Sequence, residues 1–136
     1  QWQVEHTVKA LIKKLSIKNL NYILSYQSRV GPLKWIGPST DTVIKNEAQK
    51  NKIIVVVPVA FVSEHSETLV ELDIEYKKLA TENGSKDYIR IPAVTANPDF
   101  INSLKSSILE ASNGSRFTSS IKCLEKFKKC PRLQSV

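Results

Sequence analysis

The chain has 136 residues, a formal net charge of +7 and a hydrophobic content of 41%, values that are ordinary for a single globular domain. Its longest apolar run, residues 53–62, is about half the length that a membrane-spanning helix needs, so the sequence excludes such a helix. No apolar segment of the signal-peptide type opens the chain, and we expect no signal peptide.

The first predicted element is a helix over residues 3–15, where apolar residues recur at helical spacing among lysines. This pattern starts almost at Gln1, without the capping residue that commonly precedes a helix. The chain also contains no methionine. We therefore expect this sequence to be part of a longer protein.

Strands and helices alternate along the rest of the chain. Strands are predicted over residues 21–28, 53–59 and 88–91, and two Gly-Pro steps exclude regular structure from residues 29–38. Helices are predicted from Ser39 or Thr40 to about Lys50, through an acidic segment to about Glu82, and over residues 98–111 after an Asn97 cap. This alternation predicts an α/β fold, a partial doubly wound parallel sheet flanked by helices. We assign it to residues 1–111 and a basic tail to residues 112–136.

The acidic helix directly follows the most apolar stretch, where an open α/β sheet binds its ligands. On a regular α-helix Glu67, Glu71 and Glu75 would lie within roughly 80° of one another and span about 12 Å. His65 would point roughly 160° away from Glu67, so both can face one ligand only if the first turn is irregular or His65 precedes the helix. The stripe is either a solvated acidic face or a row of carboxylates that handles metal ions or protons. The apolar face predicted to pack on the sheet consists of Leu69, Leu72, Tyr76 and Leu79.

Two long segments resemble one known family. Residues 63–76 read SEHSETLVELDIEY and residues 26–38 read YQSRVGPLKWIGP, and both resemble motifs of the ferrochelatases. Two shorter segments agree less specifically, IPAV at 91–94 and NPDF at 97–100. The resemblance covers roughly residues 2–111, implies a chelatase-like, Rossmann-type half of the fold, and favours the row of carboxylates over the solvated face.

The resemblance also implies a function. Ferrochelatases insert ferrous iron into a porphyrin during haem synthesis and displace two pyrrole protons. Glu67 matches the family's catalytic glutamate and candidate metal ligand, His65 is a ligand or a support beside it, and Glu71 and Glu75 continue a proton or metal path. Imidazole and carboxylate both suit ferrous iron. A loop tryptophan can also be a simple packing anchor, but the resemblance implies that porphyrin is bordered by Trp35, Arg29 and Ser28.

Two parts of the family have no counterpart in these 136 residues, namely the first domain and the strand that carries a facing catalytic histidine. His6 lies outside any matching motif and is predicted to be a solvated surface side chain. We therefore expect the isolated chain to be inactive and prone to aggregate through unpaired strand edges.

The tail at residues 112–136 has six Lys or Arg and one acidic residue, which is +5 of the net +7. It can form a basic amphipathic helix on an anionic membrane, or remain a solvated terminus. Nucleic acid is not an expected partner, because no recognition motif accompanies the charge. Cys123 and Cys130 are too few for an iron–sulfur cluster, which needs four thiolates, so none is predicted.

The sequence thus predicts a cytoplasmic protoporphyrin ferrochelatase, with the tail as a candidate peripheral membrane contact. Three alternatives remain open. The porphyrin can be coproporphyrin, the chain can be a non-catalytic porphyrin- or metal-binding remnant, or it can be a basic protein that binds a membrane or partner.

Overall fold

The computed structural model describes residues 1–27, 32, 35–114, 124 and 127–128, and the chain forms two compact units, Gln1–Thr95 and Ala96–Val136. Within the described residues, no helix has both the length and the apolar character needed to cross a membrane.

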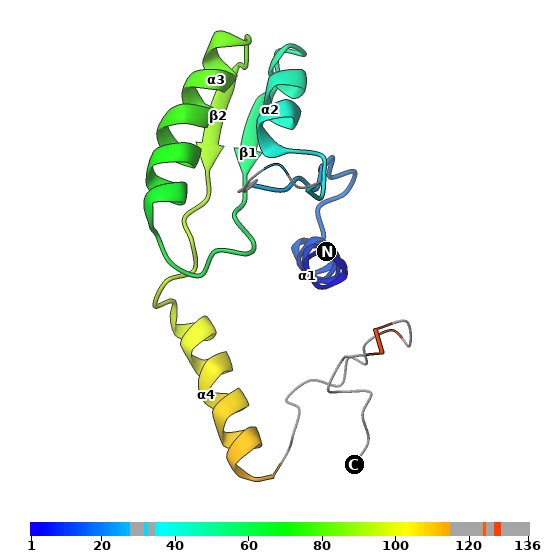
Figure 1. Ribbon diagram of the computed structural model, residues 1–136, viewed down its shortest axis with the longest axis vertical. Helices are drawn as coiled ribbons and strands as arrows, with labels where there is room; N and C mark the ends of the chain where they lie inside the picture. The colour runs from blue at the N-terminus through cyan, green and yellow to red at the C-terminus, as the bar shows by residue number, and fades with distance from the viewer. Residues whose placement is uncertain (28–31, 33–34, 115–123, 125–126, 129–136) are drawn as a thin grey trace. The chain divides into compact units, whose positions relative to one another are not determined.

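Two parallel strands form the sheet of the first unit. Strand β1 (Ile53–Val56) pairs with β2 (Asp87–Arg90), with Ile53 opposite Asp87 and Val56 opposite Arg90. A parallel pair requires a crossover connection. Here the crossover is a π-helix, η1 (Glu67–Glu75), that continues directly into α3 (Tyr76–Glu82), and Figure 1 shows it running alongside the two strands. The predicted α/β class with parallel strands is confirmed.

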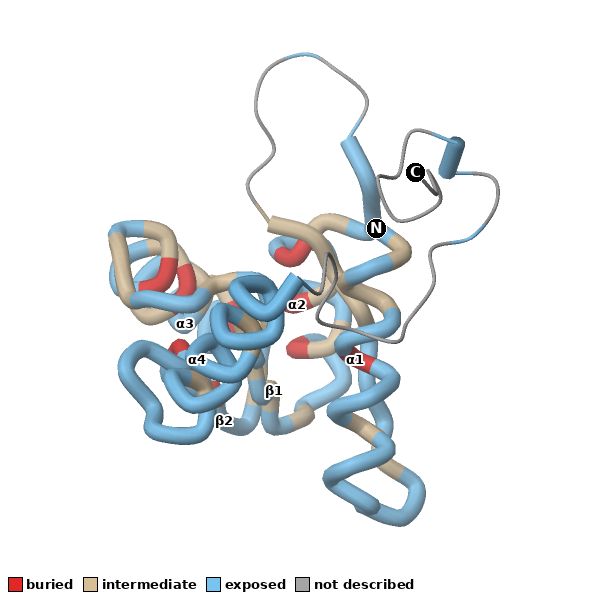
Figure 2. Tube along the Cα trace, turned by 90° about the horizontal axis from the view of Figure 1, so that it is seen from below, coloured by how far each residue is buried: buried red, intermediate tan, exposed pale blue. Residues whose placement is uncertain are grey.

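Helices α2 (Thr40–Ala48) and α3 pack on one face of this strand pair. Side chains alternate between the faces of a strand, and inward-facing Ile54 and Val56 pack with Ile44, Ala80 and Tyr88. Figure 2 shows buried residues on α2 and α3. On the other face of the strands, the large apolar side chains that stay exposed are Ile53, Val55 and Ile89.

Several predicted element boundaries are confirmed. Helix α1 spans Trp2–Leu15, and α2 begins directly after Ser39. The helix end predicted at Asn83-Gly84 is present, because α3 stops at Glu82 and Gly84 has a φ of +88°.

The second unit contains α4 (Pro98–Ser112), whose N-terminus forms as predicted. The Asn97 side chain accepts a hydrogen bond of 2.9 Å from the Asp99 N–H, and Pro98 occupies the first helical position. No residue of α4 is buried.

The strand predicted at residues 21–28 is wrong over the part that the structure describes. Residues 21–27 contain only one isolated parallel bridge, in which Tyr26 pairs with Ser39. In the described sheet β1 and β2 pair only with each other, so this segment has no strand to join. Strand β1 is also shorter than predicted and ends at Val56, two residues before Pro58.

Candidate functional site

The acidic segment is wound as a π-helix rather than as the regular α-helix that its spacing predicted. In η1 the Tyr76 N–H donates to the Glu71 carbonyl, five residues earlier. Turns closed in this way contain more than four residues, so side chains four apart lie nearly in line. The result is a row of three carboxylates, Glu67, Glu71 and Glu75, which we call the glutamate row.

The buried face of this helix has the same four-residue repeat. Thr68 and Leu72 are its buried residues in η1, and the repeat continues through half-buried Tyr76 to buried Ala80 in α3. Leu69 was predicted to pack on the sheet but is exposed, because the wider winding turns it away from the buried face.

His65 precedes η1, which is one of the two arrangements that allow it to meet Glu67. Its carbonyl accepts the N–H groups of Thr68 at 3.0 Å and Leu69 at 2.9 Å, and its ring lies edge-on to Phe61 with centroids 4.7 Å apart. The Glu67 N–H donates to His65 Nδ1 at 3.2 Å, and a Glu67 carboxylate oxygen lies 4.0 Å from the same nitrogen. The structure therefore brings together Glu67 and His65, both of which the sequence analysis named as candidate site residues.

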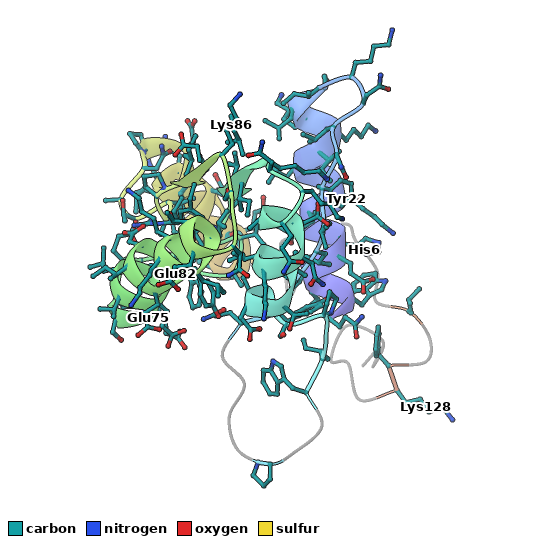
Figure 3. All side chains as sticks on the ribbon, turned by 90° about the horizontal axis from the view of Figure 1, so that it is seen from above. His6, Tyr22, Glu75, Glu82, Lys86 and Lys128 are labelled. Atoms are coloured by element: carbon teal, nitrogen blue, oxygen red, sulfur yellow. The ribbon has the colours of Figure 1, made fainter. Side chains whose placement is uncertain are left out.

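Exposure rises along the glutamate row. Glu67 and Glu71 are half-buried, whereas Glu75 is exposed. Figure 3 shows Glu75 on the same continuous helix as Glu82, an exposed glutamate outside the row. The row thus leads from the His65 end of η1 toward solvent.

Glu71 is fixed by a residue that the sequence analysis did not single out, although it belongs to the second motif. The Gln27 amide N–H donates to a Glu71 carboxylate oxygen, and the Tyr76 hydroxyl donates to the Gln27 amide oxygen at 2.6 Å. A cavity of about 280 Å³ lies beside these groups, lined also by Tyr26, Ser39, Thr40 and Asp41.

Trp35 reaches the same place from its loop. Its indole N–H donates to the Gln27 carbonyl at 3.2 Å, while the side chain stays 45% exposed. The two long motifs of the sequence therefore meet at Gln27. Ser28 and Arg29, the other two residues assigned to porphyrin, lie outside the described residues.

Arg90 on β2 forms a partly buried ion-pair network that the sequence analysis missed. Its guanidinium donates to both oxygens of Asp73 in η1, at 2.7 and 2.5 Å, and to Glu64 at 2.6 Å. Glu64 also accepts the Ala93 N–H at 2.8 Å. The Thr68 hydroxyl, the Arg90 guanidinium and the Ala93 N–H lower the pKa of the Glu64 carboxyl to about 2, and Arg90 lowers the pKa of Asp73.

Tyr88 on the same strand contacts the π-helix main chain. Its hydroxyl donates to the Leu72 carbonyl at 2.6 Å, and burial raises the pKa of the phenol to about 12. Alternation along β2 places Tyr88 and Arg90 on one face, and the period-2 pattern Tyr88-Ile89-Arg90 was the available sequence signal.

His6 lies on α1 and is exposed as predicted (Figure 3). The centroids of its ring and of the Trp2 ring lie 4.0 Å apart. Among the described residues, no three His, Cys, Asp or Glu side chains are arranged to hold one metal ion. Cys123 and Cys130 fall outside the described residues.

Comparison with known proteins gives one consistent result. The family model described as Ferrochelatase matches residues 1–112. The chain is 55% identical to a ferrochelatase of Pelagibacter ubique (strain HTCC1062), with 98% of this chain and 40% of that protein covered. It is 48% identical to a ferrochelatase of Rickettsia bellii (strain OSU 85-389), with 95% of this chain and 38% of the relative covered. The chain thus spans about two fifths of the length of these curated relatives.

Proposed function

The chain belongs to the ferrochelatase family, and on that premise we propose that its glutamate row forms the acidic wall of a site where ferrous iron enters a porphyrin. Insertion exchanges one Fe²⁺ for two pyrrole protons. The site must therefore bind the metal weakly enough to release it and must accept two protons in each turnover. A row of carboxylates that leads to solvent suits both tasks.

Glu67 is the group that we assign to the iron and to the first proton. Its carboxylate lies at the His65 end of the row, where exposure is lower than at Glu75. Because His65 Nδ1 accepts the Glu67 N–H, the neutral imidazole carries its proton on Nε2. A neutral imidazole coordinates a metal through a nitrogen that carries no proton, so we give His65 a supporting role beside Glu67.

Glu71 and Glu75 continue from Glu67 toward solvent. Carboxylates held near one another titrate as a group, and a proton accepted at the inner end can pass outward along them. The same row can deliver a hydrated cation in the opposite direction. The π-helical winding of the segment that carries the three glutamates, with His65 just before its start, is the observation that carries this proposal.

The porphyrin is proposed to lie against Trp35. The indole N–H is engaged by the Gln27 carbonyl, yet nearly half of the side chain is exposed and can stack against a flat macrocycle. Arg29 and Ser28 remain proposed contacts. We propose protoporphyrin IX as the substrate, with coproporphyrin as the alternative.

The whole activity is proposed to need more than these 136 residues, because the matched relatives are covered only to 38–40%. The test is to produce the chain alone and together with the unmatched part of the Pelagibacter ubique ferrochelatase. Insertion of Fe²⁺ into either porphyrin is then followed anaerobically by absorbance. We expect turnover only in the combined sample. Turnover by the chain alone contradicts the need for a partner, and ion binding without turnover in either sample favours the non-catalytic alternative.

The role of Glu67 is tested in the combined sample with Glu67→Gln, which removes the charge and keeps the shape. We expect loss of nearly all turnover, whereas Glu82→Gln, the exposed glutamate on the same helix, serves as the matched control. A wild-type rate for Glu67→Gln contradicts the assignment.

Two further proposals concern location. We propose that the protein is cytoplasmic and that the basic tail gives it peripheral contact with anionic membranes. The membrane contact is tested by measuring binding of the chain to anionic membranes. We expect binding that weakens as salt is added and that is lost on removal of residues 115–136.

A further inference from the structure

We propose that Tyr88 and Arg90, two residues apart on β2, set the π-helical winding of η1 and thereby keep the glutamate row in line. They are positioning residues, because their hydrogen bonds go to Leu72, Asp73 and Glu64 rather than to the carboxylates of the row. We infer the winding of η1 from these contacts and not from the proposed function. Only its meaning for metal binding rests on the proposed function.

Both side chains leave β2 on the face that packs against the helix. The Tyr88 residue is only 7% exposed and the Arg90 side chain only 8% exposed. Their partners are consecutive residues near the middle of η1, because the phenol donates to the Leu72 carbonyl and the guanidinium donates to both oxygens of Asp73. The strand therefore holds the main chain and a side chain of the π-helix at one place.

The hydrogen bond from Arg90 to Glu64 fixes the N-terminal side of the segment. Glu64 directly precedes His65, and its Oε1 accepts Arg90 Nη1 at 2.6 Å. One guanidinium thus links Glu64 to Asp73, and the whole segment from His65 to Glu71 lies between them in sequence. The number of helical turns between the two carboxylates is then limited by the fixed geometry of a single planar group.

A change of winding would break this arrangement. Each residue of an α-helix turns the chain by about 100°, and each residue of a π-helix turns it by less because the turn contains more residues. If η1 were wound as an α-helix, this difference in rotation per residue would accumulate at every residue from Glu67 onward. The Asp73 carboxylate and the Leu72 carbonyl would both rotate away from β2. The contacts of Tyr88 and Arg90 therefore stabilise the π-helix selectively, and a π-helix is otherwise rarely extended.

The consequence for the glutamate row is geometric. At about 100° per residue, successive members four apart drift by about 40°. In the π winding they stay nearly in line, so a metal ion or proton meets each carboxylate from the same side.

The test uses isotope-labelled full chain and two variants. Tyr88→Phe removes a single hydroxyl from a core ring, and Arg90→Lys keeps the charge but loses the fork. Their matched controls are Tyr22→Phe and Lys86→Gln, which alter exposed residues (Figure 3). The first readout is the pattern of main-chain hydrogen bonds in η1, measured by NMR through scalar couplings across those bonds and nuclear Overhauser effects between amide and α protons.

We expect i→i+5 bonds in the wild type and both controls, and a shift to i→i+4 bonds in Tyr88→Phe and Arg90→Lys. Retention of the i→i+5 pattern in Tyr88→Phe and in every folded variant overturns the proposal. Because Tyr88→Phe preserves the core ring, it keeps the test decisive if Arg90→Lys does not fold.

The second readout is Mn²⁺ binding, followed by broadening of the glutamate signals. We expect broadening at Glu67, Glu71 and Glu75 in the wild type, and affinity weaker by about tenfold in the two rewound variants. Absence of Mn²⁺ binding in the wild type would count against the proposed function alone, since the hydrogen-bond pattern still decides the winding. Unchanged affinity after a demonstrated rewinding would overturn the link between winding and binding.

Discussion

The main-chain N–H of Glu67 donates to Nδ1 of His65 across 3.2 Å, while the carboxylate of the same glutamate lies 4.0 Å from that nitrogen. A main-chain N–H is always a donor, so this contact assigns the imidazole proton of the neutral ring to Nε2. His6 provides the opposite case, because its Nδ1 lies 3.2 Å from the Trp2 carbonyl and must carry the proton to make that bond.

The two histidines are therefore predicted to be opposite tautomers. In the neutral form of each ring, ¹⁵N shifts should show the proton on Nε2 in His65 and on Nδ1 in His6. His6 is the internal control, since both rings are measured in one sample. A His65 ring that carries its proton on Nδ1 would contradict the contact with the Glu67 N–H.

Metal affinity is predicted to fall in a graded way along the glutamate row. We expect Glu67→Gln to weaken Mn²⁺ binding most, Glu71→Gln less and Glu75→Gln least, because Glu75 is exposed and its charge is screened by solvent. Isothermal titration of the isolated chain measures the three affinities, and Glu82→Gln should leave the affinity unchanged. Equal losses at all three positions, or a loss at Glu82, would indicate general charge attraction instead of a directed row.

Gln27 is predicted to stabilise the fold through its hydrogen bond to Glu71. Gln27→Glu replaces the amide N–H that Glu71 accepts with a second carboxylate, so a charge-assisted hydrogen bond becomes a like-charge contact. We expect the free energy of unfolding to fall by about 1.5 to 3 kcal/mol. Urea unfolding at neutral pH measures the change, with exposed Gln49→Glu as the control for an added charge. If the free energies of unfolding of the two variants differ by less than a few tenths of a kcal/mol, the hydrogen bond between Gln27 and Glu71 does not contribute to stability.

The free energy of unfolding is predicted to fall at acid pH, because the carboxyl groups of Glu64 and Asp73 have lowered pKa values in the folded chain. The pKa of Glu64 is lowered to about 2 in the folded chain from an ordinary value of 4.5, so between these values the unfolded chain binds a proton that the folded chain does not. The contribution of this group is fully present above pH 4.5 and is lost as the pH falls toward 2. The lowered pKa of Asp73 acts in the same direction.

The acid effect can be isolated by substitution. Urea midpoints measured from about pH 6 to about pH 2.5 should fall less steeply in Glu64→Gln than in the wild type, because glutamine binds no proton in either state. Glu82→Gln, which removes only an exposed partner of Lys78, should retain the wild-type slope. Equal slopes in all three chains would exclude Glu64 as a source of the acid sensitivity.

Local patterns predicted much of the fold. The strand in the apolar run and the Asn97 and Gly84 helix ends depend on residues near in sequence. Each is present in the structure, although the strand covers only Ile53–Val56 of the predicted residues 53–59. The expected strand at residues 21–28 depended on a distant pairing partner, and in the described part only Tyr26 forms a bridge.

The π-helix could not be predicted in the same way. A spacing of four fits an α-helix loosely and a π-helix closely, so Glu67 and Glu71 alone do not distinguish the two. The choice between the two windings depends on tertiary contacts, since Arg90 and Tyr88 reach η1 from a strand that follows it in sequence. The sequence therefore identified Glu67 and His65 as a pair, but it did not identify Gln27, Glu64 or Arg90.

The alignment of the glutamate row depends on the number of residues between its members more than on the identity of those residues. Exposed Val70 and Ile74 lie between members of the glutamate row in sequence, and replacing either leaves the four-residue spacing intact. Deleting one residue between Glu67 and Glu75 would move every later carboxylate by one position around the helix and shift Asp73 away from Arg90. In this stretch of chain, a change of length by one residue should therefore be less tolerated than substitution of any exposed side chain.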